Sequence, residues 1–195
     1  PEVPPRIAEA SGADAGRGVL EIGPGIGPLT AELAQRAGKV VAVELDRALL
    51  PVLAETMAPY PNVEVVPGDV LKLDLTAIAA EKFQGLTPIV CANLPYNVTS
   101  PILEKLVESP CFTAFTVMIQ REVARRLCAP QGSSEGGSFS LFLQYYMKPE
   151  LLFDVPPEKF LPAPKVTSAV VRGEQLTLED FAALSAALGR EADGD

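Results

Sequence analysis

The chain has 195 residues, of which 48% are hydrophobic and 21% charged, so it is long enough for one α/β domain with a sizeable core. It contains no histidine, which excludes Ser-His and Cys-His nucleophilic machinery and any His-ligated metal. Its formal net charge of −9 argues against a generic nucleic-acid binder, although a local basic patch is enough for a specific one.

Cysteine usage and hydropathy indicate the compartment. Cys91, Cys111 and Cys128 are an odd number with no C-x-x-C spacing, which is typical of reduced cytosolic thiols and not of a disulfide frame or a zinc site. No run approaches 18 apolar residues, and residues 1–5 lack the basic start and apolar core of a signal peptide. We therefore expect a cytoplasmic protein without a membrane span or a metal. Because the sequence does not begin with Met, we also expect it to be part of a longer protein.

The first half of the chain alternates strands and helices. After a lead-in with a short helix at residues 6–10, the pattern predicts strands at 18–22, 40–44, 63–66 and 88–92, separated by helices at 28–37, 47–57 and 75–83. This alternation implies a parallel, doubly wound sheet with right-handed crossovers.

The second half continues the alternation and ends on a pair of strands. A helix is predicted to begin at Pro101 with Ser100 as its N-cap. The later elements expected are a strand at 115–119, a basic helix at 121–127, a flexible loop at 131–137, and strands at 151–155 and 166–171. The apolar and aromatic segment 138–147 is compatible with a helix or a strand, and we favour the helix.

A glycine loop, Gly-Pro-Gly-Ile-Gly at 23–27, joins the first predicted strand to its helix, and glycines permit close approach of the backbone to a ligand. Its G-x-G-x-G spacing is not that of dinucleotide enzymes, and the preceding Glu21 would repel a pyrophosphate. Glu44 ends the second strand, where an acid binds the ribose hydroxyls of a nucleotide. Asp69 follows the third strand. Each acid alone is also compatible with a solvated strand end, but an acidic rim of all three suits S-adenosylmethionine, which is a sulfonium cation without phosphate.

The quartet Asn93-Leu94-Pro95-Tyr96 follows the fourth strand, at the edge of an open α/β sheet where ligands bind. Asn93 offers a carbonyl acceptor, and Pro95 removes a backbone donor and fixes φ. Two acceptors aimed at an exocyclic amino group localise its lone pair for attack on an electrophile. Tyr96 offers a face for base stacking, which is worth about 1–3 kcal/mol. An isolated N-x-P-Y is equally compatible with an ordinary strand-to-helix turn.

With these segments placed, the sequence resembles the ribosomal RNA adenine N6-dimethyltransferase family, and within it the branch that acts on the small ribosomal subunit. The matching segments are 19–30, 43–46, 68–71, 93–97, 119–124 and 160–171. The last three are specific to this family. Leu94 favours the small-subunit branch, because the large-subunit resistance methylases usually read N-I-P-Y.

The resemblance implies a class I S-adenosylmethionine-dependent methyltransferase fold, with a seven-stranded, mostly parallel sheet and an antiparallel final hairpin. It implies two successive methyl transfers to each of two adjacent adenosines in a hairpin near the 3′ end of 16S rRNA, in the small ribosomal subunit, by a monomer that needs no metal. No general base is required before the amino group attacks, so the lack of histidine does not impair this mechanism.

The resemblance also assigns roles by position. The cofactor-binding residues that it implies are Glu21, Gly23, Gly25, Glu44, Leu45, Asp69, Val70 and Asn93. Glu44 is expected to hold the ribose and Asp69 the adenine amino group, with Val70 beside it. The residues implied to act on the target base are Asn93, Leu94, Pro95, Tyr96 and Phe160, of which the last two stack on the flipped base.

Two of these interpretations have an open alternative. Phe160, which lies among prolines, is also typical of a packed loop anchor. Arg121, Arg125 and Arg126 are expected either to contact RNA phosphates or to form a solvated helix face.

The two ends of the chain depart from the family pattern. The basic N-terminal segment with Gln-Asn-Phe-Leu has no match, and the small basic helical domain at the family's C-terminus is matched only by residues 178–188, which precede an acidic tail. We therefore expect a methyltransferase domain over residues 1–173 and a remnant of a helical domain over 174–195.

Two other function classes compete with the enzyme. One is a non-catalytic assembly or transcription factor that binds RNA or DNA on the same fold. It would explain why the two ends of the chain depart from the family pattern, but the intact quartet and glycine loop argue against it. A nicotinamide-dependent oxidoreductase is disfavoured by the loop spacing and by Glu21.

Overall fold

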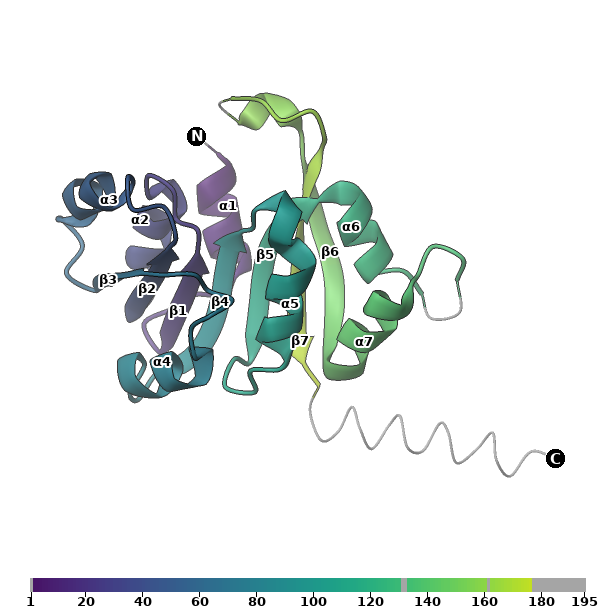
Figure 1. The fold of residues 1–195 in the computed structure, drawn as a ribbon, viewed down its shortest axis with the longest axis horizontal. Helices are drawn as coiled ribbons and strands as arrows, with labels where there is room; N and C mark the ends of the chain where they lie inside the picture. The colour runs from purple at the N-terminus through teal and green to yellow at the C-terminus, as the bar shows by residue number, and fades with distance from the viewer. Residues whose placement is uncertain (1, 131–132, 161, 177–195) are drawn as a thin grey trace.

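The computed structural model describes residues 2–130, 133–160 and 162–176 (Figure 1). The helix expected at 178–188 and the acidic tail lie outside the described residues. None of the helices formed by the described residues is long and apolar enough to cross a bilayer.

In the described residues, seven strands form one sheet, which confirms the predicted fold class. They are β1 (Arg17–Ile22), β2 (Lys39–Glu44), β3 (Val63–Pro67), β4 (Thr87–Asn93), β5 (Ala114–Gln120), β6 (Met147–Val155) and β7 (Ser168–Gln175). Their order is β3-β2-β1-β4-β5-β7-β6, and β1 to β5 are parallel. β7 lies antiparallel to both β5 and β6, as predicted for the final hairpin. It extends to Gln175, so the first residues after the expected boundary at 173 still belong to the sheet.

Helices cover both faces of the sheet (Figure 1). They are α1 (Val3–Ala10), α2 (Pro28–Ala34), α3 (Leu50–Met57), α4 (Leu75–Lys82), α5 (Thr99–Val107), α6 (Arg121–Leu127) and α7 (Ser138–Tyr146). Short 3₁₀ turns occupy Tyr96–Val98 and Pro157–Lys159. The strands and helices expected before residue 174 are all present among the described residues, and most differ by a few residues at their ends. Residues 131–132 of the loop expected at 131–137 lie outside the described residues.

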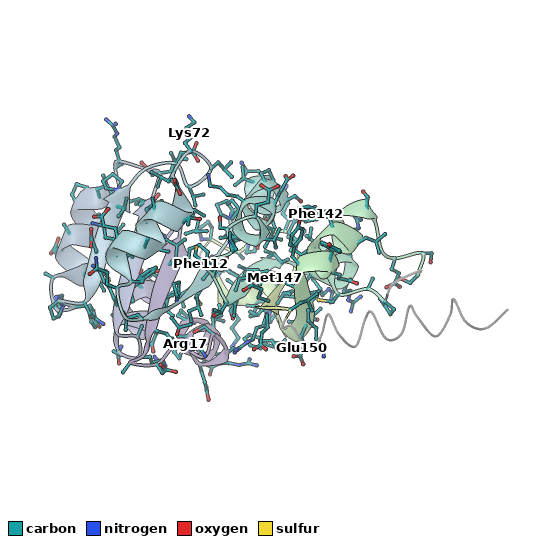
Figure 2. The ribbon with its side chains drawn as sticks, turned by 90° about the horizontal axis from the view of Figure 1, so that it is seen from below. Arg17, Lys72, Phe112, Phe142, Met147 and Glu150 are labelled. Carbon is teal, nitrogen blue, oxygen red and sulfur yellow. The ribbon has the colours of Figure 1, made fainter. Side chains whose placement is uncertain are left out.

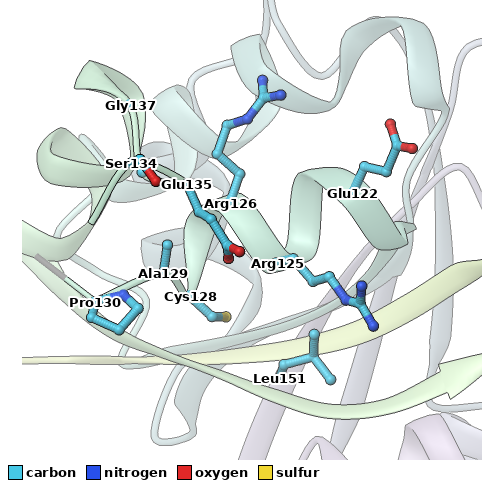
Figure 3. A pocket seen from close by; sticks show the side chains of 11 residues that line it. Glu122, Arg125, Arg126, Cys128, Ala129, Pro130, Ser134, Glu135, Gly137 and Leu151 are labelled. Carbon is cyan, nitrogen blue, oxygen red and sulfur yellow. The ribbon is translucent and has the colours of Figure 1, made fainter.

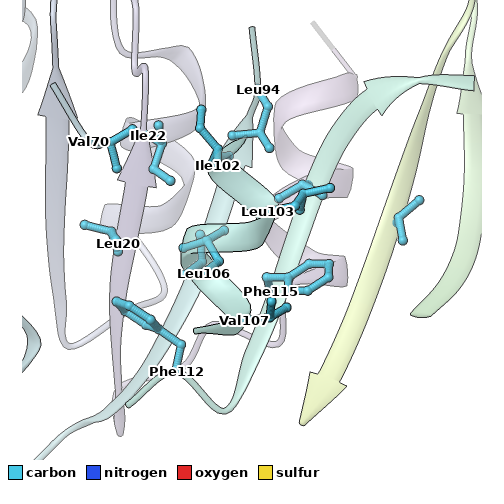
Figure 4. Packing of buried hydrophobic residues seen from close by; sticks show 14 of the residues in the cluster. Leu20, Ile22, Val70, Leu94, Ile102, Leu103, Leu106, Val107, Phe112 and Phe115 are labelled. Carbon is cyan, nitrogen blue, oxygen red and sulfur yellow. The ribbon is translucent and has the colours of Figure 1, made fainter. Parts of the chain in front are cut away.

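Alternate residues of each strand point to opposite faces and build two apolar clusters. On one face, side chains such as Leu20, Val90 and Val117 pack against α4 to α7. On the other face, side chains such as Val19 and Ile89 pack against α1 and α2. Figure 4 shows the first cluster under α5, and Figure 2 shows Phe112 and Met147 in the interior, whereas Lys72 lies on the outside.

The start of α5 corrects one prediction. The helix begins at Thr99, and its N-cap is Val98, so Ser100 is not the N-cap and Pro101 is the third helical residue. The 3₁₀ turn before it, in which the Val98 N–H donates to the Pro95 carbonyl at 3.2 Å, runs directly into the helix. Pro101 is tolerated because the N–H groups of the first helical turn have no partner within the helix.

Two further boundaries differ because of local hydrogen bonds. α2 ends at Ala34 because the chain tightens after it, and the Arg36 N–H donates to the Leu33 carbonyl three residues back. α3 begins at Leu50 because the Asp46 side chain accepts a hydrogen bond from the Ala48 N–H and holds the preceding residues in a turn.

Gly173→Ala tests how tightly the sheet packs around β7. Gly173 pairs with Phe115 of β5, and a Cβ added at Gly173 would lie 2.5 Å from Cζ of that buried ring. We expect a loss of about 1–3 kcal/mol in the free energy of unfolding, because the ring has no free space into which to move. Urea denaturation measures it. Gly137→Ala is the control, because a Cβ there meets no atom within 4 Å; equal stability of the two variants would contradict the expectation.

Candidate active site

A cavity of about 340 Å³ opens at the carboxyl ends of β1, β2 and β3, beside the start of α5. It is lined by Ile22, Gly23, Val43, Glu44, Leu45, Asp46, Gly68, Asp69, Val70, Leu71, Pro95, Val98 and Ile102. Six of the residues expected to bind a cofactor or act on a base therefore meet in one place. The other seven lining residues were not predicted as site residues: Ile22, Val43, Asp46, Gly68, Leu71, Val98 and Ile102. Five of them are apolar, and an apolar residue near a strand or helix end gives no local signal that separates a cavity wall from core.

The glycine loop reaches this cavity through Gly23. Gly23 and Gly25 have φ of 66° and 63°, and a Cβ added at either would meet no atom within 4 Å. Backbone conformation, and not packing, therefore requires glycine at both positions. The loop leaves open space beside its backbone, which is what close approach of a ligand needs.

Glu44 holds the glycine loop against the end of β2. Its side chain is only 6% exposed and accepts hydrogen bonds from the Gly25 N–H at 3.2 Å and the Asp46 N–H at 2.8 Å. A carboxylate has about four acceptor positions, so two remain for hydroxyl groups in the cavity. The geometry is compatible with the ribose role expected for Glu44.

Asp69 and Val70 form the opposite side, after β3. Asp69 accepts a hydrogen bond from the Leu71 N–H at 3.0 Å and lies 3.7 Å from the ammonium of Lys72, and one carboxylate oxygen is thus fixed by the turn. Val70 is buried, whereas Leu45 is 67% exposed and lines the same cavity. An acid between apolar side chains suits a flat heteroaromatic ring that carries an amino group.

Glu21 does not lie on the acidic rim, which corrects that part of the prediction. It is 1% exposed, because β1 is a central strand that pairs with β2 on one side and β4 on the other. Its Oε2 atom has no hydrogen-bond partner among the described residues. Burial raises the pKa of this carboxyl to about 8, and the charge of Glu44 acts in the same direction. Glu21 is therefore an uncharged group beneath the loop at neutral pH. Whether it contributes to cofactor binding remains a prediction.

The quartet turns two side chains outward and one inward. Asn93, at the end of β4, and Pro95 are exposed, whereas Leu94 is buried in the core beside Ile102 (Figure 4). The Leu94 N–H donates to the Met118 carbonyl of β5 at 3.0 Å. Pro95 lines the cavity. The quartet and the acids Glu44 and Asp69 therefore border the same cavity.

Tyr96 is fixed by a residue that the sequence did not single out. Its hydroxyl lies 2.6 Å from Oγ of Ser168, the first residue of β7. Ser168 is fully buried and pairs with Gln120 and Val155 in the neighbouring strands, so it is a rigid anchor. Ser168 stands 72 positions from Tyr96, and no local pattern marks a serine for such a contact.

Phe160 follows the 3₁₀ turn of the loop between β6 and β7. It is partly buried and packs against the apolar cluster that α1 and α2 cover. The neighbouring Lys159 lies 3.1 Å from Glu2, which joins this loop to the N-terminal region. The packing agrees with the interpretation of Phe160 as a loop anchor, and its stacking role remains a prediction.

Comparisons with known proteins show the family of this chain. The sequence model of the family "Ribosomal RNA adenine dimethylase" matches residues 1–180. Ribosomal RNA small subunit methyltransferase A of Alkaliphilus oremlandii is 48% identical over 85% of this chain and 58% of its own length. The protein of the same name from Geobacillus thermodenitrificans is 48% identical over 86% of this chain and 58% of its own length. The chain thus spans somewhat more than half the length of these relatives.

Solved structures show the same fold. The 23S rRNA methyltransferase ErmE superposes with a TM-score of 0.77 at 31% identity, over 90% of this chain and 68% of that one. A dimethyladenosine transferase from Plasmodium falciparum superposes with a TM-score of 0.80 at 29% identity, over 93% of this chain and 64% of that one. The sheet described above is therefore that of class I methyltransferases.

Glu21→Gln tests the buried carboxyl. Its pKa is about 8 in the folded chain and about 4.5 unfolded, so the folded state binds more protons between these values and stability falls as pH rises through that window. The slope reaches at most about 1.4 kcal/mol per pH unit. Glutamine does not ionise, so the variant lacks this loss of stability. We therefore expect the unfolding free energy of the variant minus that of the wild type to increase from about pH 5 to about pH 8. Urea midpoints measure this, and a difference that does not change with pH would show that Glu21 ionises normally.

Proposed function

Because the chain belongs to the ribosomal RNA adenine dimethylase family, we propose that it dimethylates N6 of two adjacent adenosines in the 3′-terminal hairpin of 16S rRNA, with S-adenosylmethionine as methyl donor. The names of the relatives at 48% identity support the small subunit as substrate. The proposed reaction is a step of ribosome biogenesis in the cytoplasm, performed by a single copy of the chain.

The observation that carries the proposal is that the quartet borders the cavity of Glu44 and Asp69, through Pro95. A cavity of about 340 Å³ is within the range of small-molecule sites, which is about 300–1,000 Å³. An enzyme that moves a group from a cofactor to a base needs the two ligands side by side, and this edge of the sheet offers both places.

The residues of the cavity fit S-adenosylmethionine. Two carboxylates, Glu44 and Asp69, disfavour a phosphate-bearing ligand and suit one with ribose hydroxyls and an amino group. Gly23 and Gly25 leave room beside their backbone for the methionine portion. When bound, this cofactor supplies a methyl group activated by the positive charge on sulfur.

The quartet prepares the target amino group. The exposed Asn93 carboxamide and the Leu94 carbonyl accept hydrogen bonds from N6, which holds its lone pair out of the purine ring for attack. Tyr96, held by Ser168, supports the face of the flipped base. The extra proton leaves N6 after attack, so no side chain has to act as a general base beforehand.

The direct test is nucleoside mass spectrometry on undermethylated small ribosomal subunits that have been incubated with this chain and S-adenosylmethionine. We expect N6,N6-dimethyladenosine to appear. If it is absent with this chain and also with a version carrying the family's terminal segments, the dimethylation proposal is wrong and a non-catalytic platform is favoured.

Asn93→Ala tests the amino-group acceptor. We expect the methylation rate to fall by about 10²-fold or more, because the amino group is no longer oriented, while calorimetric binding of S-adenosylmethionine changes little. Asn97→Ala is the matched control, because it removes another exposed amide from the same loop. A wild-type rate for Asn93→Ala would contradict the assigned role.

Ser168→Ala and Tyr96→Phe test the hydrogen bond that holds the ring. Each removes one partner of a bond worth about 0.5–1.5 kcal/mol, so we expect KM for the RNA substrate to rise by roughly 2- to 10-fold. The double variant should resemble the single ones, since both lose the same bond. Tyr60→Phe is the control for loss of a tyrosine hydroxyl elsewhere. Additive effects in the double variant would mean that the two side chains act independently.

A further inference from the structure

A larger hollow, of about 970 Å³, lies beside α6 (Figure 3). It shares no lining residue with the cavity of Glu44 and Asp69. Its lining comes from α6, from the segment that follows it and from β6: Glu122, Arg125, Arg126, Cys128, Ala129, Pro130, Ser134, Glu135, Gly136, Gly137 and Leu151. These residues are called the α6 groove. The proposed methyl transfer gives none of them a role.

Two arginines that form no ion pair with any described residue stand next to each other in the α6 groove. The other exposed basic side chains in no ion pair with the described residues, Arg6, Arg47, Lys148 and Lys165, stand singly in the sequence. In the described part of the chain, the basic side chains that form ion pairs with carboxylates are Arg17, Arg36, Lys39, Lys72, Lys82, Arg121, Lys159 and Arg172. Arg125 and Arg126 are exposed, adjacent, and in no ion pair with the described residues. Figure 3 shows them diverging from α6, with Arg125 directed toward Leu151.

The fold does not use these two guanidinium groups. α6 is held by Ala124 and Leu127, which are buried in the core. Its last turn is held through backbone carbonyls, because Ser140 Oγ donates to the Arg126 carbonyl at 2.7 Å and Gln144 Nε2 donates to that of Leu127 at 2.8 Å. Replacing the arginine side chains therefore leaves the packing of α6 intact.

The helix α6 connects the groove to the edge at which the target base is proposed to lie. α6 starts at Arg121, whose N–H donates to the Thr167 carbonyl at 3.0 Å, next to Ser168 and its partner Tyr96. Arg125 lies one helical turn further, a rise of about 6 Å along the axis. A strand whose base is held at Tyr96 therefore passes the arginines within a few nucleotides.

We propose that the α6 groove binds the sugar–phosphate backbone of the RNA that carries the target adenosines, with Arg125 and Arg126 as its phosphate contacts. Open arginines without carboxylate partners are typical phosphate ligands, because the guanidinium fork matches phosphate oxygens. Glu122 and Glu135 also line the groove, so an extended strand that passes over the arginines fits better than a compact polyanion. The proposal rests on the proposed function for its RNA, and it gives that RNA a route to the site.

The test measures binding of a labelled RNA hairpin with two adjacent loop adenosines to the whole chain, over about 50–200 mM salt. We expect the double variant Arg125→Ala and Arg126→Ala to bind more weakly and to lower the slope of log K against log salt by about 1.4–1.8, as for two lost phosphate contacts. Its kcat at saturating small subunits and its S-adenosylmethionine affinity should stay at wild-type values.

Two matched variants test whether the change in RNA binding depends on where the charges are removed and on their sign. Arg17→Ala with Arg36→Ala also removes two positive charges, from residues outside the groove that pair with Asp14 and Glu32, and should leave the slope near that of the wild type. Glu122→Gln with Glu135→Gln removes the acids of the groove and should tighten binding.

The outcomes separate the two proposals. A wild-type slope in the Arg125 and Arg126 variant, or an equal loss in the Arg17 and Arg36 control, overturns the groove assignment whether or not the chain methylates RNA. RNA binding that depends on the two arginines, in a wild-type chain that forms no dimethyladenosine, upholds the groove and rejects the proposed reaction.

Discussion

The burial of Leu94 is the constraint on which the site depends. Its side chain lies in the core against α5, and its N–H donates to the Met118 carbonyl of β5. These two contacts fix the backbone at the end of β4. Because side chains of an extended segment alternate, the neighbours Asn93 and Pro95 must face outward. A polar or smaller residue at Leu94 would loosen all three positions together. The chemistry at this edge is thus positioned by an apolar contact beneath it.

The antiparallel strand β7 gives this edge its second support. It inserts between β5 and β6, and its first residue, Ser168, reaches the Tyr96 hydroxyl. The Thr167 carbonyl beside it accepts the N–H that begins α6. Three segments that are distant in sequence therefore meet around the start of β7. They are the quartet, the loop of Phe160 and α6. A purely parallel sheet would not return the chain to this edge without another crossover helix.

Local pattern predicted the alternating strands and helices, the glycine loop and the positions of Glu44 and Asp69, because strand runs, glycines and acids at strand ends are short-range signals. The antiparallel final hairpin was expected only from the family resemblance. Long-range contacts explain the failures. Glu21 follows the same acidic pattern but is buried by strands on both sides, and Ser100 looks like an N-cap although the preceding 3₁₀ turn starts the helix earlier. Ser168 carries no local signal, because only the pairing of β7 with β5 brings it to Tyr96.

The net charge of −9 and a proposed RNA partner are compatible, because association depends on where unpaired charges lie. Eight of the described basic side chains lie within 4 Å of a carboxylate, which weakens their attraction for RNA. Arg125 and Arg126 are two adjacent arginines in the last turn of α6 that pair with no carboxylate of the described residues. An acidic surface with a short basic stretch near the reactive edge disfavours non-specific binding and retains attraction where a target base has to enter. In the proposed complex with RNA, charge distribution would therefore contribute to substrate selection before any contact with a base is made.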